Sequence, residues 1–478
     1  MFKKIDFKNL IPKKLELLLL AFFLIVRISS FFIYNYNLVF VNNLISFILI
    51  ASFAYFSFKK PHFAWILLIT ELLLDGAGHF FEFSGLILRT WLLGIFALTW
   101  LYKKIKDRKL ELTLPKPILI TLLLSICVIF FSTILGIANN HGTMLVLQDT
   151  ILYFFLFLIF PALEFTNFPK KYFLSIIKVF IFGTAIFSFL TFLTYSARFG
   201  ILHDNYYKWF RDIVGGKITD LGNNFFRIVL SEQLYIIPLL LIVASYLIKD
   251  IKNKTNWFLT SALMLMLIMN MSRIYFLALA LGLLFLALKN NLKKWFQVSF
   301  LFFIIFTVLF FSLSFISSNF KSTGLSLVGV KIASVQKPKE DISANIRLAM
   351  LPDIKEKINT HPYFGSGLAT QVSYEDPVTK KMVSRTQFDW GYLEMLAELG
   401  IVGSIIFLIF ILTILYYLAK LTYKEKNPLF QGLFAGAISL FVINLTTPAL
   451  FQGFGILYFV FILKIISDNF KTNDASLK

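Results

Sequence analysis

The chain has 478 residues, of which 58% are hydrophobic and 18% aromatic. An ordinary water-soluble protein is about 45–50% apolar, so the composition excludes that class. The formal charge of +20 would suit a nucleic-acid-binding protein, but the basic residues form short clusters at the ends of apolar runs. That pattern argues against nucleic acid as a partner and is typical of a protein oriented among membrane lipids.

Apolar runs long enough to cross a bilayer recur along nearly the whole chain. A helix needs about 20 apolar residues to cross the hydrocarbon, and continuous rather than alternating hydrophobicity favours helices over a barrel. The sequence therefore predicts an all-α integral membrane protein, a polytopic helical bundle of about 14 transmembrane helices. The predicted helices begin near residues 15, 38, 62, 83, 117, 145, 172, 228, 256, 272, 297, 390, 429 and 449.

The basic clusters also predict the orientation of the bundle. They mark every second connection between the apolar runs, from Lys3 to Lys426, and positive loops stay in the cytoplasm. Both termini of this multi-pass protein are therefore predicted to be cytoplasmic. The chain divides into a region of eleven helices at 1–318, a large extracytoplasmic loop at 319–389, and three helices with a cytoplasmic tail at 390–478. The first run, Leu15 to Phe32, lacks a small-residue cleavage pattern and is predicted to remain as an anchor.

Two long loops are predicted on the outer side. Charge, Pro, Gly and Ser return in 319–389, and loops of this size are usually functional or disordered. Apolar residues at helical spacing over Asn345 to Asn359 predict an amphipathic helix within it. The loop at 196–227 mixes Lys208 and Arg211 with aromatic side chains, which favours an anchor at the level of the lipid headgroups. These aromatic residues are Tyr206, Tyr207, Trp209 and Phe210.

Three arginines lie at the predicted outer ends of helices or in the large loop. Arg227 opens the eighth predicted span, Arg273 opens the tenth after a very short turn, and Arg347 lies in the loop that also holds His361 and Asp389. Guanidinium groups bind phosphate through two parallel hydrogen bonds, so three of them at one pocket would suit a diphosphate. For Arg273 the tight turn favours this role. For Arg227 and Arg347 a contact with lipid headgroups explains the residue equally well.

Other charges inside the spans have simpler interpretations. Glu71, Asp75 and His79 recur every fourth residue on one helix face, and Arg89 begins the next span at a similar depth. Buried charges are normally paired, so a structural ion pair between these helices is predicted. Arg27, in the first span, is predicted to extend towards the headgroups.

The chain shows none of the patterns of soluble enzymes. It has no Gly-rich phosphate loop, no Cys and His spacing for a metal, and no Asp-x-Asp pair in the outer loops. The single cysteine, Cys127, excludes an intrachain disulfide. We therefore predict no metal and no cofactor, so that arginines supply the positive charge for any departing diphosphate.

Three stretches together resemble the O-antigen ligase and polymerase superfamily of bacterial membrane proteins. The resemblance covers roughly residues 225–445. Its motifs are Met271-Ser272-Arg273-Ile274-Tyr275, then Asn345-Ile346-Arg347 with His361-Pro362-Tyr363-Phe364-Gly365-Ser366-Gly367, and finally Asp389-Trp390-Gly391-Tyr392-Leu393-Glu394 continuing to Glu398-Leu399-Gly400-Ile401-Val402-Gly403.

The resemblance implies a glycosyltransferase that acts outside the cytoplasmic (inner) membrane without a metal or a nucleotide donor. Glycans on undecaprenyl diphosphate would be both donor and acceptor, and a chain-length regulator is a possible partner. By match to the family pattern, Arg273 and Arg227 would hold the diphosphate with Arg347 nearby, and Asp389 would act as general base. Further substrate contacts would come from Tyr392 and from His361, although the His-Pro turn is more simply interpreted as a structural cap.

The residue at the position of the base separates the possible activities. Ligases of the family show His-Asn three residues before the Tyr-Leu pair, where this chain has Asp389-Trp390. An acidic residue there is more similar to polymerases, so the favoured function is polymerisation of lipid-linked repeat units. Transfer to a lipid or protein by a ligase stays an alternative. A flippase for the same lipid is a second alternative, but a flippase needs charges deep within its spans rather than a large outer loop.

Overall fold

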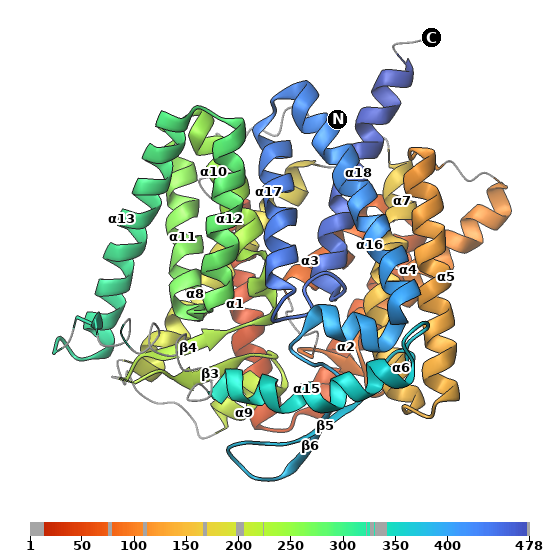
Figure 1. The fold of residues 1–478 in the computed structure, drawn as a ribbon, viewed down its shortest axis with the longest axis horizontal. Helices are drawn as coiled ribbons and strands as arrows, with labels where there is room; N and C mark the ends of the chain where they lie inside the picture. The colour runs from red at the N-terminus through yellow and green to blue at the C-terminus, as the bar shows by residue number, and fades with distance from the viewer. Residues whose placement is uncertain are drawn as a thin grey trace.

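A computed structural model describes residues 14–74, 79–108, 112–165, 170–196, 205–222, 224–321, 323–325, 329 and 342–475. Within these residues, nine helices are long and apolar enough to cross a membrane, and two shorter apolar helices accompany them. Most run side by side as one bundle (Figure 1). The prediction of a polytopic, mainly helical membrane protein is therefore confirmed, whereas the number of fourteen crossings stays a prediction.

The first half of the chain supplies six of the nine long apolar helices and one of the two shorter ones, together with two small hairpins. In order, its elements are α1 (Lys14–Asn35), α2 (Val39–Lys59), α3 (Pro61–Leu74), β1 (Glu82–Phe83), β2 (Leu86–Ile87), α4 (Leu88–Asp107), α5 (Lys116–Ala138), α6 (Thr143–Phe154), η3 (Phe155–Leu158), α7 (Ile159–Glu164), α8 (Lys170–Ser196), α9 (Tyr206–Asp212), β3 (Lys217–Asp220), β4 (Phe226–Val229), η4 (Ser231–Tyr235) and α10 (Ile236–Lys249).

The second half contains the large predicted loop and the last helices. Its elements are α11 (Lys254–Asn270), α12 (Arg273–Lys289), α13 (Leu292–Ser317), α15 (Ile342–Thr360), β5 (Val372–Glu375), β6 (Met382–Arg385), α16 (Gly391–Glu425), α17 (Pro428–Ile443) and α18 (Gly453–Ala475). Each sheet is one antiparallel pair, β1 with β2, β3 with β4, and β5 with β6.

Asparagine caps start several of the helices that follow basic connections. The side chain of Asn253 accepts from Asn256 N at the start of α11, and that of Asn427 accepts from Leu429 N at the start of α17. An asparagine at this position satisfies an amide that the helix cannot pair itself, which stabilises the helix by about 1 kcal/mol. The cap residues therefore fix where these helices begin after each connection.

Helices α10 and α17 pack closely because small residues line their contact. A Cβ added at Gly432 would lie 2.5 Å from Ile242 Cα, and one added at Gly436 would lie 3.1 Å from Pro238 Cα. The four-residue spacing of the two glycines is the small-residue pattern that lets membrane helices approach backbone to backbone. This contact holds α17 against α10, the helix that follows η4.

Helix α16 is broken near its beginning. Gly400 has φ 67° and ψ −176°, which are not helical values, so a short helix from Gly391 precedes the long membrane helix. Ile401 N donates to Pro362 O at 2.9 Å, and Val402 N donates to Tyr363 O at 3.1 Å. The segment that follows α15 therefore inserts at this break and accepts hydrogen bonds from it.

Helix α15 lies across one end of the bundle, on the same side as the hairpins β3–β4 and β5–β6 (Figure 1). Helix α18 ends at the opposite side. The amphipathic helix predicted within 319–389 is confirmed, because Met350 and Ile354 are buried in a small cluster with Val372, Tyr374 and Phe388. The hairpin β5–β6 in the same loop was not predicted.

The loop at 196–227 differs from its prediction. Trp209 and Phe210 are 1% and 0% exposed; the ring of Phe210 stacks on Phe187 of α8, and that of Trp209 meets Phe187 edge to face. They belong to the core of the bundle, so the interpretation of these two residues as headgroup anchors is wrong. Tyr207, which is 41% exposed, remains available for that role.

Candidate functional site

Arg227 and the turn before Arg273 form the first part of the candidate site. Arg227 lies on β4, paired with Thr219 of β3, and its Nε donates a hydrogen bond of 2.5 Å to the carbonyl of Asn270. Asn270 ends α11, Met271 follows with φ 48°, and α12 begins at Arg273. The structure thus brings Arg227 to the turn that presents Arg273, and both arginines are half-buried.

A buried pair of amide side chains supports this turn. Asn270 Nδ2 donates to Gln233 Oε1 at 2.5 Å, and the same oxygen accepts from Leu230 N at 3.2 Å. Asn270 Oδ1 and Gln233 Nε2 are buried without a hydrogen-bond partner in the described part of the chain. Because an unpaired buried polar atom costs about 1–3 kcal/mol, these two atoms mark the turn as a place where a polar ligand can bind.

The sequence predicted that Arg227 opens a helix, but the residue lies on strand β4. The run Phe226 to Val229 is rich in β-branched and aromatic residues, which fit a pleated strand, and it pairs with β3. The helix predicted to begin near residue 228 therefore starts at Ile236, after η4. The strand directs Arg227 towards α11, where its Nε reaches the carbonyl of Asn270.

Arg347 and Asp389 form the second part of the site. Arg347 lies on α15, and its carbonyl oxygen accepts from Trp390 Nε1 at 3.1 Å. Asp389 directly precedes Trp390, is half-buried and has φ 56°. Arg347 Nε is buried and has no hydrogen-bond partner among the described residues, so this donor is available to an anion. The contacts thus link Arg227 to the turn before Arg273, and Arg347 to Trp390, the neighbour of Asp389.

Tyr392 fixes the start of α16 against α17. Its hydroxyl donates to Phe441 O at 2.9 Å. The neighbouring Gly391 lies so close to α17 that an added Cβ would be 2.5 Å from Asn444 Oδ1. The Tyr392 hydroxyl proton is therefore used within the protein, and a substrate contact would have to come from the ring or from the phenol lone pair.

The His-Pro segment is held by its main chain. Ser366 N donates to Ala397 O at 2.8 Å and Gly367 N donates to Glu398 O at 3.1 Å, across the break in α16. Gly365 and Gly367 have φ values of 73° and 91°, which favour glycine. His361 itself is exposed, and its ring makes no hydrogen bond within the described residues. The turn is thus stabilised by backbone contacts rather than by a cap from the imidazole.

Residues 258–408 match the model of the family described as O-Antigen ligase. This stretch of the chain is similar to the O-antigen ligase family. The resemblance drawn from the sequence motifs to the ligase and polymerase superfamily is thereby confirmed. The matched stretch runs from α11 into α16, and Arg227 lies before it. The comparison with curated proteins found no match.

A pair of carboxylates, Asp149 and Glu398, was not predicted from the sequence. Ala369 N donates to Asp149 Oδ2 at 2.9 Å and to Glu398 Oε1 at 3.1 Å. Asp149 belongs to α6, outside the matched stretch, so the pair joins that stretch to the first half of the chain. The signal was present, because an ionisable residue inside a predicted span always needs a structural or functional reason.

The charges predicted to pair between α3 and α4 do so. Arg89 Nε lies 3.2 Å from Glu71 Oε2, and both side chains are about nine-tenths buried. His79 pairs instead with Glu82, at 2.8 Å, and Asp75 lies outside the described residues. Glu71, Arg89 and His79 thus pair within the protein, and their charges do not call for a ligand.

The prediction for Arg27 is wrong. Arg27 is 0% exposed, and its guanidinium lies 2.6 Å from the carboxylate of Glu232 in η4. The rings of Phe23 and Phe187 lie 4.6 Å and 4.5 Å from the guanidinium carbon. Arg27 therefore turns into the bundle, because Glu232 offers a charged partner there that the sequence position did not reveal.

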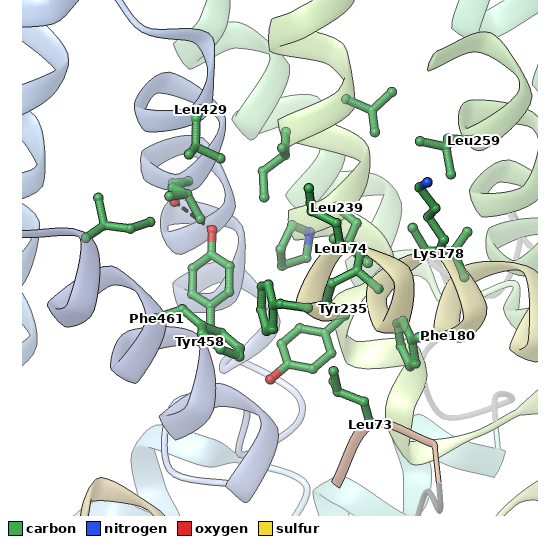
Figure 2. A pocket seen from close by; sticks show the side chains of 18 residues that line it. Leu73, Leu174, Lys178, Phe180, Tyr235, Leu239, Leu259, Leu429, Tyr458 and Phe461 are labelled. Carbon is green, nitrogen blue, oxygen red and sulfur yellow. Dashed lines mark hydrogen bonds between the residues drawn. The ribbon is translucent and has the colours of Figure 1, made fainter. Parts of the chain in front are cut away.

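The interior of the bundle contains an apolar cavity. Figure 2 shows it between α8, α10, α17 and α18, with Tyr235 and Tyr458 among its lining residues. Both hydroxyls donate to main-chain carbonyls, Tyr235 to Phe454 and Tyr458 to Leu433. The described residues also contain no group of three or more His, Cys, Asp or Glu side chains arranged for a metal ion.

Proposed function

We propose that the chain polymerises lipid-linked oligosaccharide repeat units at the outer face of the bacterial cytoplasmic membrane. It would transfer a glycan from undecaprenyl diphosphate to a hydroxyl of an acceptor sugar on a second lipid-linked unit. The observation that carries this proposal is the hydrogen bond from Arg227 to the turn that presents Arg273. Two guanidinium groups from separate elements at one turn suit the two phosphates of a diphosphate.

The reaction needs positive charge at the departing diphosphate of the donor and a base at the hydroxyl of the acceptor. The acceptor hydroxyl oxygen attacks the anomeric carbon of the donor, the bond from that carbon to the diphosphate oxygen breaks, and Asp389 takes the hydroxyl proton. Arg273 and Arg227 stabilise the negative charge on the departing polyprenyl diphosphate. Arg347 would contact the donor or the acceptor as they meet, because its Nε is buried without a hydrogen-bond partner among the described residues and its carbonyl accepts from Trp390, the neighbour of Asp389.

Asp389 favours polymerisation over ligation. It stands where the ligases of the family resemblance carry histidine, and a carboxylate can act as the base for a sugar hydroxyl. Export of the lipid is disfavoured, because the cavity inside the bundle is lined almost wholly by apolar side chains (Figure 2). Its one charged lining residue, Lys178, pairs with Glu16 at 2.8 Å.

The test compares lipid-linked glycans in cells that carry Arg273→Ala, Arg273→Lys or the unaltered chain. Removing a positioned donor to developing charge costs on the order of 10²–10³ in rate, so Arg273→Ala is expected to accumulate single repeat units. Lysine keeps the positive charge but lacks the planar guanidinium group that donates two parallel hydrogen bonds. Arg273→Lys is therefore expected to yield only part of the normal amount of polymer. Arg211→Ala is the control, because Arg211 is exposed on α9 and pairs with the adjacent Asp212.

The other outcomes identify the alternatives. Long polymer that is not attached to its acceptor would indicate a ligase, and precursors retained on the cytoplasmic side would indicate a flippase. Normal glycans in the Arg273→Ala cells would remove Arg273, and the diphosphate site with it, from the proposal.

A further inference from the structure

The backbone of Asp389 is in a conformation that must be held in place. Asp389 has φ 56°, in the left-handed region that L-residues rarely adopt outside turns. Aspartate tolerates this region better than most residues, but a free turn would also populate other conformations. Since a base must lie within hydrogen-bond reach of the proton that it takes, the direction of this side chain depends on what fixes the turn.

Both neighbours of Asp389 are fixed. Phe388 N donates to Glu394 Oε2 at 2.8 Å, and the Phe388 ring is 0% exposed in the cluster beneath α15. On the other side, Trp390 Nε1 donates to Arg347 O at 3.1 Å. Asp389 itself remains half-buried between these two anchors, so its carboxylate is the part of the turn left free to face a substrate.

Glu394, like Glu398 one turn further along α16, is a buried carboxylate that accepts a backbone amide. It is 5% exposed and belongs to the first turns of α16, yet no Lys or Arg of the described residues forms an ion pair with it. Its hydrogen bond reaches back six residues to the amide before Asp389. Burying a carboxylate without a cation is unfavourable, so a requirement for this one contact would explain the residue.

We propose that Glu394 is a positioning residue that holds Asp389 in its reactive direction through the amide of Phe388. The proposal rests on the proposed function, because it assumes that Asp389 is the base. Glu394 is less suited to be the base itself, since its side chain is buried and one of its oxygens is already occupied by Phe388 N.

The test is a double-mutant cycle on the purified protein with lipid-linked repeat units. Glu394→Leu removes the acceptor and is expected to lower kcat about 10- to 100-fold at nearly constant KM, because a base displaced by about 1 Å loses that much. Glu394→Gln keeps an acceptor for Phe388 N and is expected to retain most of the rate. In the Asp389→Asn background, Glu394→Leu is expected to cause no further loss, since it acts only through Asp389.

Trp390→Phe is a second test variant, for use if Glu394→Leu does not fold. It keeps an aromatic ring but removes the hydrogen bond to Arg347 O, and it is expected to lower kcat about tenfold with Asp389 present. Like Glu394→Leu, it should have no effect in the Asp389→Asn background. Thermal unfolding of each variant in detergent separates the loss of rate from a loss of stability.

Two results would overturn the inference in different ways. If Asp389→Asn is slow as expected but Glu394→Leu slows it further by the same factor as in the unaltered chain, Glu394 does not act through Asp389. The proposed function would survive that result. If Asp389→Asn keeps the full rate, the assignment of the base fails and the positioning role fails with it.

Discussion

Arg27 and Glu232 show how this bundle tolerates charge far from water. Both side chains are 0% exposed, and they lie on α1 and η4, which are 205 residues apart in the chain. A second donor bond runs from Arg27 to Leu74 O at 3.2 Å. Because η4 directly follows the strand that carries Arg227, this ion pair fixes the region beneath the proposed diphosphate site.

Removal of one partner of this ion pair is expected to be strongly destabilising. Arg27→Met leaves Glu232 charged and buried, and breaking a buried pair in this way costs about 3–5 kcal/mol of unfolding free energy. Replacing both residues, as Arg27→Met with Glu232→Gln, is expected to recover most of the loss. Thermal unfolding in detergent measures both variants. Equal stability of the single variant and the unaltered chain would mean that the ion pair contributes nothing.

Asp376 gives the hairpin β5–β6 a dependence on pH. Hydrogen bonds from Thr379 N and Val378 N, at 2.9 Å and 2.8 Å, lower the pKa of this carboxyl below its ordinary value. A lowered folded-state pKa means that the ionised form stabilises the turn above the unfolded value of about 3.9. The contribution is lost as the pH falls through the folded pKa.

Amide hydrogen exchange measures this effect directly. Protection of Val378 and Thr379, relative to the intrinsic exchange rate, is expected to be steady near pH 6 and to fall below about pH 4. Asp376→Asn cannot ionise, so its protection should not change over the same range. A fall of equal size in both proteins would assign the effect to another group.

At the scale of elements, the break in α16 determines how the outer loop is joined to the membrane helices. An alanine at Gly400 would place its Cβ 2.5 Å from Phe364 N, at a φ of 67° that favours glycine. The strained backbone alone costs about 1–3 kcal/mol, and the main chain of the inserted segment has no room to move away. Gly400→Ala is therefore expected to lower both the stability and the rate of glycan transfer.

Gly94→Ala is the matched control for that variant. Gly94 lies within α4, and an added Cβ would meet nothing within 4 Å. Alanine in a helix is favoured over glycine by about 0.5–1 kcal/mol, so this variant should be as stable as the unaltered chain or slightly more stable. Thermal unfolding and the yield of polymer are measured for both. A Gly400→Ala protein that matches Gly94→Ala would show that the break is not needed.

Local patterns were sufficient to predict some elements. The amphipathic spacing around Met350 and Ile354 predicted α15, and the charge spacing predicted the ion pair of Glu71 with Arg89. These features depend on a few residues within one or two neighbouring helices, and periodicity reports such features directly. The apolar runs likewise predicted most helix starts.

Features that depend on distant partners could not be predicted. The sequence around Arg27 contains nothing that points to Glu232, and the run around Gly400 is apolar on both sides of the break. Asp149 meets Glu398 only because Ala369 is inserted between α6 and α16. In each case the deciding contact joins segments far apart in the chain, and no local period encodes it.

At the scale of the whole molecule, the features proposed for function gather at one end of the bundle. Helix α15 and the hairpins β3–β4 and β5–β6 lie there, and α18 ends at the other side (Figure 1). The family match begins in α11, yet Arg227, Glu232 and Asp149 come from the first half of the chain. The first half therefore helps to build the site, and the matched region alone would lack these contacts.

The direction of this end relative to the cell can be tested with single cysteines. Lys380 is exposed in the turn of β5–β6, and Lys424 is exposed at the far end of α16. After Cys127→Ala removes the native thiol, Lys380→Cys is expected to react with a membrane-impermeant maleimide on intact spheroplasts. Lys424→Cys should react only after permeabilisation, because basic connections remain in the cytoplasm. The reverse pattern would place Asp389 and the arginines on the cytoplasmic side, where the proposed transfer between exported lipid-linked glycans could not occur.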